Sequence, residues 1–209
     1  MVARMGTDDK GKVTNEGTPF LFTPVFFFPE WCVWNPLELK DKLPMIRERT
    51  FDPQNPIAKK ARDPQLRFEP FPDNPQYKLR YVEHLNFVIM LDPSHEFGAQ
   101  PIILTFCRGE HVAGSRLCSA ITMRKAPLYG CVFEGRVGTP RANERGSWYG
   151  LDARNPESSS PWVEKGRFEA HKAIHEEFKA LHADAKVRVD YDKDSEADPA
   201  ATAEGPEKF

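Results

Sequence analysis

The first third of this chain is rich in proline. Eleven of the 19 prolines in 209 residues lie between Pro19 and Pro75. Each removes a backbone N–H and clashes with a preceding helical turn, which excludes long regular helices there. The apolar run PFLFTPVFFFP at 19–29 predicts an extended segment packed on a core, at a sheet edge. Residues 35–77 hold eight prolines and predict a long irregular insertion, with a short helical turn around 55–62.

After residue 77 the pattern changes to β-forming runs and two helical periods. Strands are predicted at 78–91, 100–107, 128–137 and 147–153. A short helix is predicted at 114–125, with Ser115 as its N-cap. A long helix is predicted at 162–186, because apolar residues and a histidine repeat along one face there.

Strand pairs separated by a short helix predict a mainly β fold with helices, namely a small β-barrel of the OB type. An α+β sandwich is the alternative. The predicted organisation is a disordered N-terminus at 1–18, an aromatic and proline-rich arm at 19–77 packed on the core, an OB-like core with a C-terminal helix at 78–189, and a disordered acidic tail at 190–209.

The net charge of −2 conceals an uneven distribution. Residues 190–209 hold seven acids and two bases, so that segment carries −5 and the remaining 189 residues carry +3. Residues 105–150 hold seven bases against three acids. A basic body with an acidic tail favours an anionic partner and a tail that competes with it, although a solvated surface with a solubilising tail has the same composition.

Motifs for chemistry are weak. The chain has no GxSxG, GxxxxGK[ST] or GxGxxG sequence, and its four cysteines form no CxxC pair. The cysteines lie in apolar surroundings, which favours reduced, inert thiols. His171 and His175 have a spacing that can hold a metal, but their helix face favours ordinary packing. We therefore expect no enzyme activity, no cofactor and no metal. A small nucleic-acid-processing enzyme using His84, His95 or His111 is the less favoured alternative.

Basic and aromatic residues fall together in the predicted core. Arginine and lysine neutralise phosphates, and the bases of a single strand stack on aromatic rings. The candidate phosphate contacts are Arg116, Arg124, Lys125, Arg141 and Arg145, and the candidate stacking residues are Phe106, Tyr129, Trp148 and Tyr149. Adjacent strand residues face opposite ways, so one of the Trp148–Tyr149 pair is expected to serve the core.

One stretch resembles a known class of proteins. A Pro–aromatic strand followed by Asn–x–Lys/Arg–Gly–x–Trp–aromatic and a helix is similar to small bacteriophage and prophage proteins of the replication and recombination region. The matching positions here are Pro127, Tyr129, Asn143, Arg145, Gly146, Trp148 and Tyr149. More loosely, the basic OB-like body and acidic tail ending in phenylalanine resemble phage and bacterial single-stranded-DNA-binding proteins. The resemblance spans Tyr81 to His182; the Glu–Lys–Phe ending and the 35–77 insertion depart from it.

The resemblance implies a non-enzymatic protein that coats single-stranded DNA during phage replication or recombination. Its tail, with Phe209 at the tip, would dock replication or recombination proteins, and self-association into a homo-oligomer is compatible with such a role. We expect a cytoplasmic location, in the host if the source is viral, and no membrane partner. The alternative is a virion-associated or protein-interaction module that docks through an exposed aromatic segment near the N-terminus.

Overall fold

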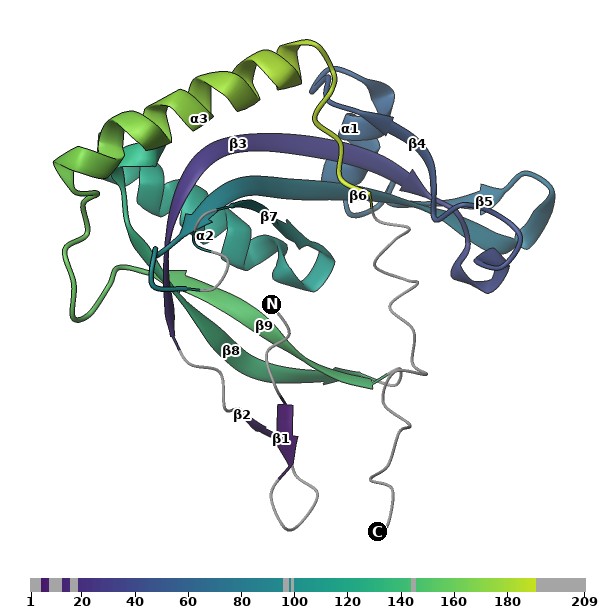
Figure 1. The fold of residues 1–209 in the computed structure, drawn as a ribbon. Coiled ribbons are helices and arrows are strands. Elements are labelled where there is room, and N and C mark those ends of the chain that lie inside the picture. Colours follow the sequence, from purple (N-terminus) through teal and green to yellow (C-terminus); the bar gives the residue numbers. More distant parts are fainter. Residues whose placement is uncertain are drawn as a thin grey trace, which may run out of the picture. The chain divides into compact units, whose positions relative to one another are not determined.

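The structure is a computed structural model (Figure 1). It describes residues 5–7, 13–15, 19–95, 98, 100–143 and 146–190, with side chains for all of these except 5–7, 13–15 and 139–149. The strands are β1 (Met5–Thr7), β2 (Val13–Asn15), β3 (Phe20–Trp34), β4 (Ile46–Thr50), β5 (Phe68–Phe71), β6 (Asn74–Leu91), β7 (Pro101–Cys107), β8 (Phe133–Asn143) and β9 (Gly146–Arg154). The helices are α1 (Pro56–Arg62), α2 (His111–Met123) and α3 (Lys165–Ala183), and short 3-10 turns lie at Leu37–Leu39, Arg108–Glu110 and Leu128–Gly130.

The chain divides into two compact units. Unit 1 comprises residues 1–30 and 83–187, and unit 2 comprises residues 31–82 and 188–209. The long strands β3 and β6 each contribute residues to both units. The first half of the aromatic arm, at 19–30, therefore belongs with the predicted core rather than with the insertion that follows it.

Unit 1 has the strand order of an OB fold. Its strands are hydrogen-bonded in the order β7–β6–β3–β8–β9, and α2 lies between the third and fourth strands along the chain. The pairs β6–β7, β3–β8 and β8–β9 are antiparallel. Figure 1 shows this sheet curled into a half-barrel. The prediction of a mainly β, OB-like fold with helices is confirmed, and the sandwich alternative is not adopted.

The aromatic run forms a central strand. β3 pairs with β8 on one side and follows β6 in the sheet order on the other, so the prediction of an edge strand is wrong. Phe22, Val25, Phe26 and Phe28 are all buried. The exposed aromatic strip on which the protein-docking alternative depends is therefore absent from the described part of this strand.

The inner face of the half-barrel packs on α2. Phe22, Phe87, Phe106, Leu117 and Phe133 belong to one apolar cluster there. The helix begins at His111, four residues before the predicted N-cap, so that Ser115 lies in its second turn and the prediction for Ser115 is wrong. Gly114 lies in the first turn of this helix, and a Cβ at this position would lie 2.6 Å from Phe106 Cβ. The helix can approach β7 closely at that position because glycine has no side chain.

The outer face of β3 packs on α3, above the arch of strands in Figure 1. The Phe26 ring lies against Phe178 and His175, with ring centres 6.4 and 5.8 Å apart. His175 Nδ1 donates to the Val25 carbonyl oxygen at 2.7 Å. His171 is 4% exposed, and burial lowers the pKa of its imidazole, which favours the neutral form. The predicted helix face thus serves packing, and the described residues contain no cluster of three or more potential metal ligands.

Unit 2 folds the stretch that the sequence predicts to be irregular. β4 pairs with the end of β3, and β5 pairs with the start of β6. The predicted helical turn is α1, where Asn55 caps the first turn by accepting from the Ile57 N–H. Trp31, Ala58, Ala61, Phe71 and Tyr81 form a separate apolar cluster. The Arg62 guanidinium lies 4.6 Å from the centre of the Trp31 ring.

Several predicted boundaries shift. β8 starts five residues later than predicted and continues to Asn143, so backbone predicted as a polar loop is strand. The predicted disorder at 1–18 and 190–209 lies outside the described residues, except that β1 and β2 pair with each other and residue 190 follows α3 without regular structure. Among the described helices, none has the length and apolar character needed to span a membrane.

The two helical glycines of unit 1 test the packing of α2. We expect Gly114→Ala to lower the free energy of unfolding by about 1–3 kcal/mol, since overpacking against Phe106 outweighs the ~1 kcal/mol that alanine gains in helix propensity. Gly166→Ala is the matched control, because a Cβ there meets nothing within 4 Å. Urea unfolding of both variants decides the matter: equal stabilities would contradict the close packing of α2 on β7.

Candidate nucleic-acid interface

OB folds bind oligonucleotides on the face of their second and third strands and with the loops that join strands one to two and four to five. In unit 1 the second and third strands are β6 and β7. On the face opposite the core, His84 and Asn86 of β6 are 0% exposed, and Thr105 of β7 donates to Asn86 Oδ1 at 2.7 Å. This face is therefore closed along β6, whereas Ile103 of β7 on the same face is 36% exposed.

The loop between the fourth and fifth strands is the turn between β8 and β9. It carries the predicted Arg141, Trp148 and Tyr149 on its flanking strands. The backbone register pairs Arg141 with Trp148 and Pro140 with Tyr149. The side chains of these residues, and all of Arg145 and Phe209, lie outside the described residues. The register nevertheless brings a predicted phosphate contact and a predicted stacking residue to opposite positions on neighbouring strands.

Phe106 is a core residue. It is 1% exposed and its ring meets that of Phe87 edge-on, with ring centres 5.8 Å apart. No base can reach this ring without opening the core, so the prediction of Phe106 as a stacking residue is wrong. Its alternation in the strand is compatible with either face, and burial against α2 decides which face it takes.

Tyr129 is half-buried between α3 residues. Its ring centre lies 5.2 Å from that of Phe168 and 5.0 Å from that of His175. Both contacts anchor the turn at Leu128–Gly130 on α3. Tyr129 therefore serves packing. Part of its side chain remains accessible to solvent.

Arg124 holds a loop in place. Its guanidinium donates to the carbonyl oxygens of Val132 and Pro161, at 2.9 and 2.8 Å, and to Asn155 Oδ1. The guanidinium carbon also lies 4.0 Å from the centre of the Phe133 ring. Arginine can satisfy three acceptors and cover a ring at once because its planar fork carries five N–H donors. Arg124 is thus committed to internal contacts, and we correct its role from phosphate contact to structural support.

Further basic residues are neutralised by acids. Arg136 pairs with Glu134 and with Glu157, and Arg154 pairs with Glu157 at 3.1 Å. Because the acids lie so close to these two arginines, the opposite charges largely cancel. Arg136 and Arg154 therefore contribute little electrostatic attraction for phosphates. The hydrogen bond from Arg136 also lowers the pKa of the Glu134 carboxyl, which keeps the pair ionised.

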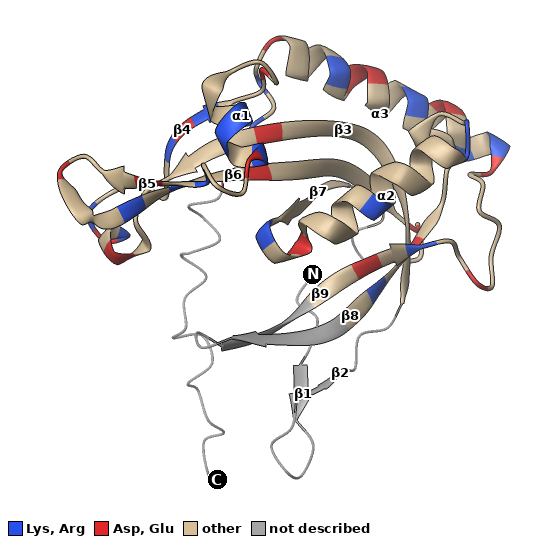
Figure 2. Cartoon of the chain, turned by 180° about the vertical axis from the view of Figure 1, so that it is seen from behind, with Lys and Arg blue, Asp and Glu red and all other residues tan. Residues whose placement is uncertain are grey.

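Arg116 and Lys125 remain exposed. They belong to α2 and the turn after it, a segment at 111–133 that carries three bases and no acid. In Figure 2, α2 is mostly tan with one blue patch and no red, in contrast to the mixed charges along α3. Arg116 also borders an open groove of about 380 Å3 along α2, whose rim includes Val112 and Met123. Among the predicted phosphate contacts whose side chains the structure describes, Arg116 and Lys125 are the exposed ones.

Trp162 is an exposed aromatic residue that the sequence analysis does not single out. Its side chain is 47% exposed, and the Arg124 guanidinium carbon lies 5.6 Å from its ring centre. Its backbone forms a bridge with Cys131, which fixes the residue beside the start of β8. An available signal was its position in the mainly polar sequence SSSPWVEK, where Val163 is the one aliphatic neighbour. A preformed, partly exposed indole is a suitable platform for a base.

The histidines of the enzyme hypothesis fall in different environments. His84 is fully buried in β6, and His95 lies in the turn after Asp92. His111 Nε2 lies 2.7 Å from Glu83 Oε2, and its Nδ1 lies 3.4 Å from Ser115 Oγ. This series resembles an acid–base–nucleophile arrangement, but Ser115 lies inside α2, where backbone N–H groups bond within the helix and cannot stabilise an oxyanion. The pair Glu83–His111 instead fastens the first turn of α2 to β6.

The cysteines are thiols. All four are free, and burial raises the pKa of Cys118 to about 11. A thiol with so high a pKa is almost entirely protonated at neutral pH and is a poor nucleophile.

Comparisons with known proteins identify no relative. No protein-family model, no curated protein sequence and no solved structure matches this chain. The function is therefore argued from the geometry described above.

The role of Arg124 can be tested by stability. We expect Arg124→Gln to lower the free energy of unfolding by about 1–3 kcal/mol, because the carbonyl oxygens of Val132 and Pro161 lose their donor. Arg116→Gln, within the helix that Arg124 follows, is the matched control and should stay within about 0.5 kcal/mol of the parent protein. Urea denaturation followed by tryptophan fluorescence measures both; an Arg124→Gln variant as stable as Arg116→Gln would contradict the structural role.

Proposed function

We propose that this protein binds single-stranded DNA without catalysing a reaction, and coats exposed strands during bacteriophage replication or recombination. The observation that carries the proposal is the exposed indole of Trp162, which lies beside the guanidinium of Arg124, a residue of the acid-free basic segment 111–133. Stacking of bases on an exposed ring combined with phosphate neutralisation is the mode by which proteins bind single strands with little sequence preference.

The proposed path combines described and predicted contacts. Arg116 and Lys125 neutralise phosphates, and Trp162 accepts a base. Arg141, Arg145, Trp148 and Tyr149 extend the interface along the β8–β9 hairpin, which occupies the position of an OB-fold binding loop. The acidic tail, with Phe209, competes with the strand for the basic surface and docks replication or recombination proteins.

The electrostatic part predicts a salt dependence. Each phosphate contact on a single strand contributes about 0.7 to the slope of log K against log salt, so Arg116→Ala with Lys125→Ala should weaken oligo(dT) binding at low salt and reduce that slope by about 1.4. Fluorescence anisotropy with labelled oligo(dT) over a salt series measures both quantities.

Lys179→Ala is the control for these charges. Lys179 is an exposed base on α3 that pairs with Glu176, so its loss should leave both affinity and slope close to those of the parent protein. Absence of oligo(dT) binding by the parent protein at low salt would refute the proposed function. Stronger binding by a chain that ends at residue 189 would support competition by the tail.

The stacking part predicts an effect that salt does not change. Trp162→Ala should weaken oligo(dT) binding by about 1–3 kcal/mol at every salt concentration, because a stacked base loses its platform. Trp162→Phe keeps a ring and should recover most of the affinity. If Trp162→Ala binds like the parent protein while remaining folded by circular dichroism, Trp162 is not part of the interface.

A further inference from the structure

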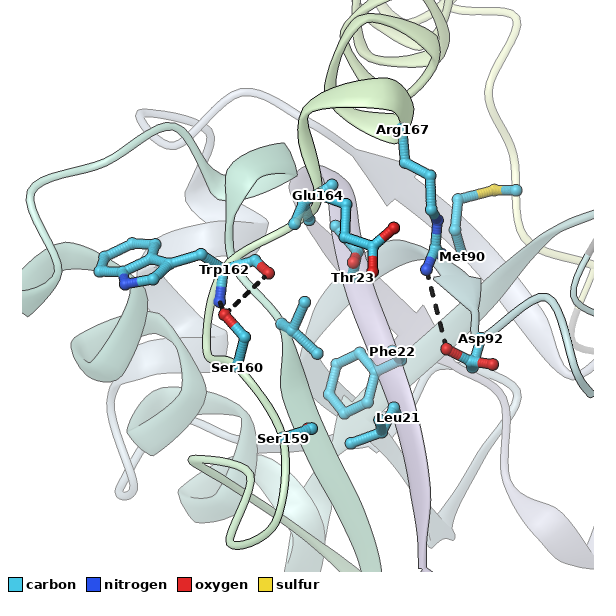
Figure 3. Close-up of a pocket in the computed structure, with 12 residues that line it drawn as sticks. Leu21, Phe22, Thr23, Met90, Asp92, Ser159, Ser160, Trp162, Glu164 and Arg167 are labelled. Atoms are coloured by element: carbon cyan, nitrogen blue, oxygen red, sulfur yellow. Dashed lines mark hydrogen bonds and ion pairs between the residues drawn. The ribbon is translucent and has the colours of Figure 1, made fainter.

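A small cavity lies within unit 1 where α3 begins (Figure 3). Its volume is about 120 Å3, below the roughly 300 Å3 at which pockets for drug-sized ligands begin. It therefore suits a single ring system rather than a whole nucleotide. Its apolar lining includes Phe22, Met90 and Val132, and its polar lining includes Thr23, Asp92, Ser159, Ser160, Glu164 and Arg167.

Three polar groups line this cavity, one from β3 and two from the start of α3. Figure 3 shows the Glu164 carboxylate and the Arg167 guanidinium, both from the start of α3, in the space above Phe22, with the Thr23 side chain next to the carboxylate. Thr23 is 2% exposed and lines the cavity. A hydroxyl at the wall of a cavity can donate one hydrogen bond to a ligand and accept others from it.

The carboxylate and the guanidinium both have capacity left for a ligand. Glu164 is the N-cap residue of α3, yet its side chain forms no capping hydrogen bond. Arg167 reaches Asp92 at 3.7 Å, which is an ion pair too long for a good hydrogen bond. Hydrogen bonds from Ser94 lower the pKa of the Asp92 carboxyl, so Asp92 stays ionised beside Arg167.

The charge balance selects the part of a nucleotide that can enter. Two carboxylates and one guanidinium give the cavity a net charge of −1, which disfavours a phosphate. A neutral planar ring fits between the apolar lining and the polar edge. In pockets that hold an unstacked base, hydrogen bonds to its Watson–Crick edge supply the recognition.

Guanine is the base whose edges match the groups present. A carboxylate is an acceptor with two oxygens, and guanine places two adjacent N–H donors, at N1 and N2, on its Watson–Crick edge. Arginine forms its commonest specific contact with guanine, to O6 and N7. Adenine and cytosine each offer one amino group beside a ring acceptor, and thymine offers one N–H between two carbonyls. Each of these bases would therefore satisfy the two oxygens of Glu164 less well than guanine does.

We infer that this cavity binds one unstacked guanine of the bound strand, with Glu164 at N1 and N2, Arg167 at O6 and N7, and Thr23 at the closed end. The inference rests on the proposed function and deepens it, because it adds a preference for guanine to otherwise sequence-tolerant binding. The cavity adjoins the backbone of Trp162, whose ring points away from it, so a neighbouring base can stack outside while the guanine enters.

The test compares labelled dT oligonucleotides with one central dG, dA or dC against all-dT, by anisotropy on the full chain. We expect the dG oligonucleotide to bind about ten-fold tighter than all-dT, and dA and dC to resemble all-dT. Glu164→Gln removes one of two acceptor oxygens and should abolish the preference while leaving oligo(dT) affinity unchanged. Glu169→Gln, an exposed carboxylate farther along α3, is the matched control and should keep the preference.

A second measurement separates this inference from the proposed function. Titration with guanosine alone, followed by NMR shifts of the Met90 methyl group, should show binding that Thr23→Val and Glu164→Gln weaken. Tight oligo(dT) binding with no dG preference and no guanosine binding would overturn the guanine site and leave the single-strand function standing. Guanosine binding without any oligonucleotide binding would refute the single-strand function and retain guanine as the ligand of the cavity.

Discussion

Burial of β3 on both faces is the constraint on which unit 1 depends. A strand with phenylalanine at 22, 26, 27 and 28 cannot leave either face in water without losing roughly 1.5–3 kcal/mol per exposed side chain. One face packs on α2 and the other on α3, and the turn at Leu128–Gly130 is fastened to α3 through Tyr129. The helices are therefore required parts of the half-barrel. Because α2 fills its inner face and β6 is closed on its outer face, the surface left for a ligand lies at the periphery, on α2, the β8–β9 hairpin and the loop at 155–162.

Much of the architecture could be predicted because periodicity reports burial. The β-forming runs of β6 and β7 and the helical period of α3 each follow from side chains that must be buried, and the predicted ranges agree with the strands and helix to within four residues. The start of α2 could not be predicted in this way. Gly114 and Ser115 are typical of a helix boundary, yet the contact of Gly114 with Phe106 is a tertiary interaction that no local pattern contains. The insertion at 35–77 misled for a related reason: its prolines occupy ends and edges of short elements, whose shared core through Trp31 and Phe71 is non-local.

The candidate interface was predictable by residue type and much less by role. Composition identifies arginines and aromatics near one another, but it does not tell which of them the fold itself consumes. Arg124 donates to three internal acceptors, Arg136 pairs with two acids, and Phe106 lies in the core. Of the predicted phosphate contacts whose side chains are described, Arg116 and Lys125 remain exposed. Trp162 was missed because it stands in a polar loop whose position depends on Arg124. The Arg124 guanidinium thus holds the loop so that the Trp162 ring keeps a fixed position at the surface.

This use of arginine has a consequence for how the proposed interface would work. The Trp162 ring lies beside the Arg124 guanidinium, which three hydrogen bonds hold in place. The ring therefore loses little conformational freedom when a base stacks on it, and the stacking free energy is not offset by the cost of ordering the loop. Two of the predicted phosphate contacts, Arg116 and Lys125, are described and exposed, so counterion release at these two would supply a modest share of the affinity. Binding that depends on stacking more than on charge tolerates higher salt and senses base identity more than a purely electrostatic groove does. A cavity that distinguishes one base beside such a platform would then contribute a larger fraction of the total binding energy than it would in a strongly basic groove.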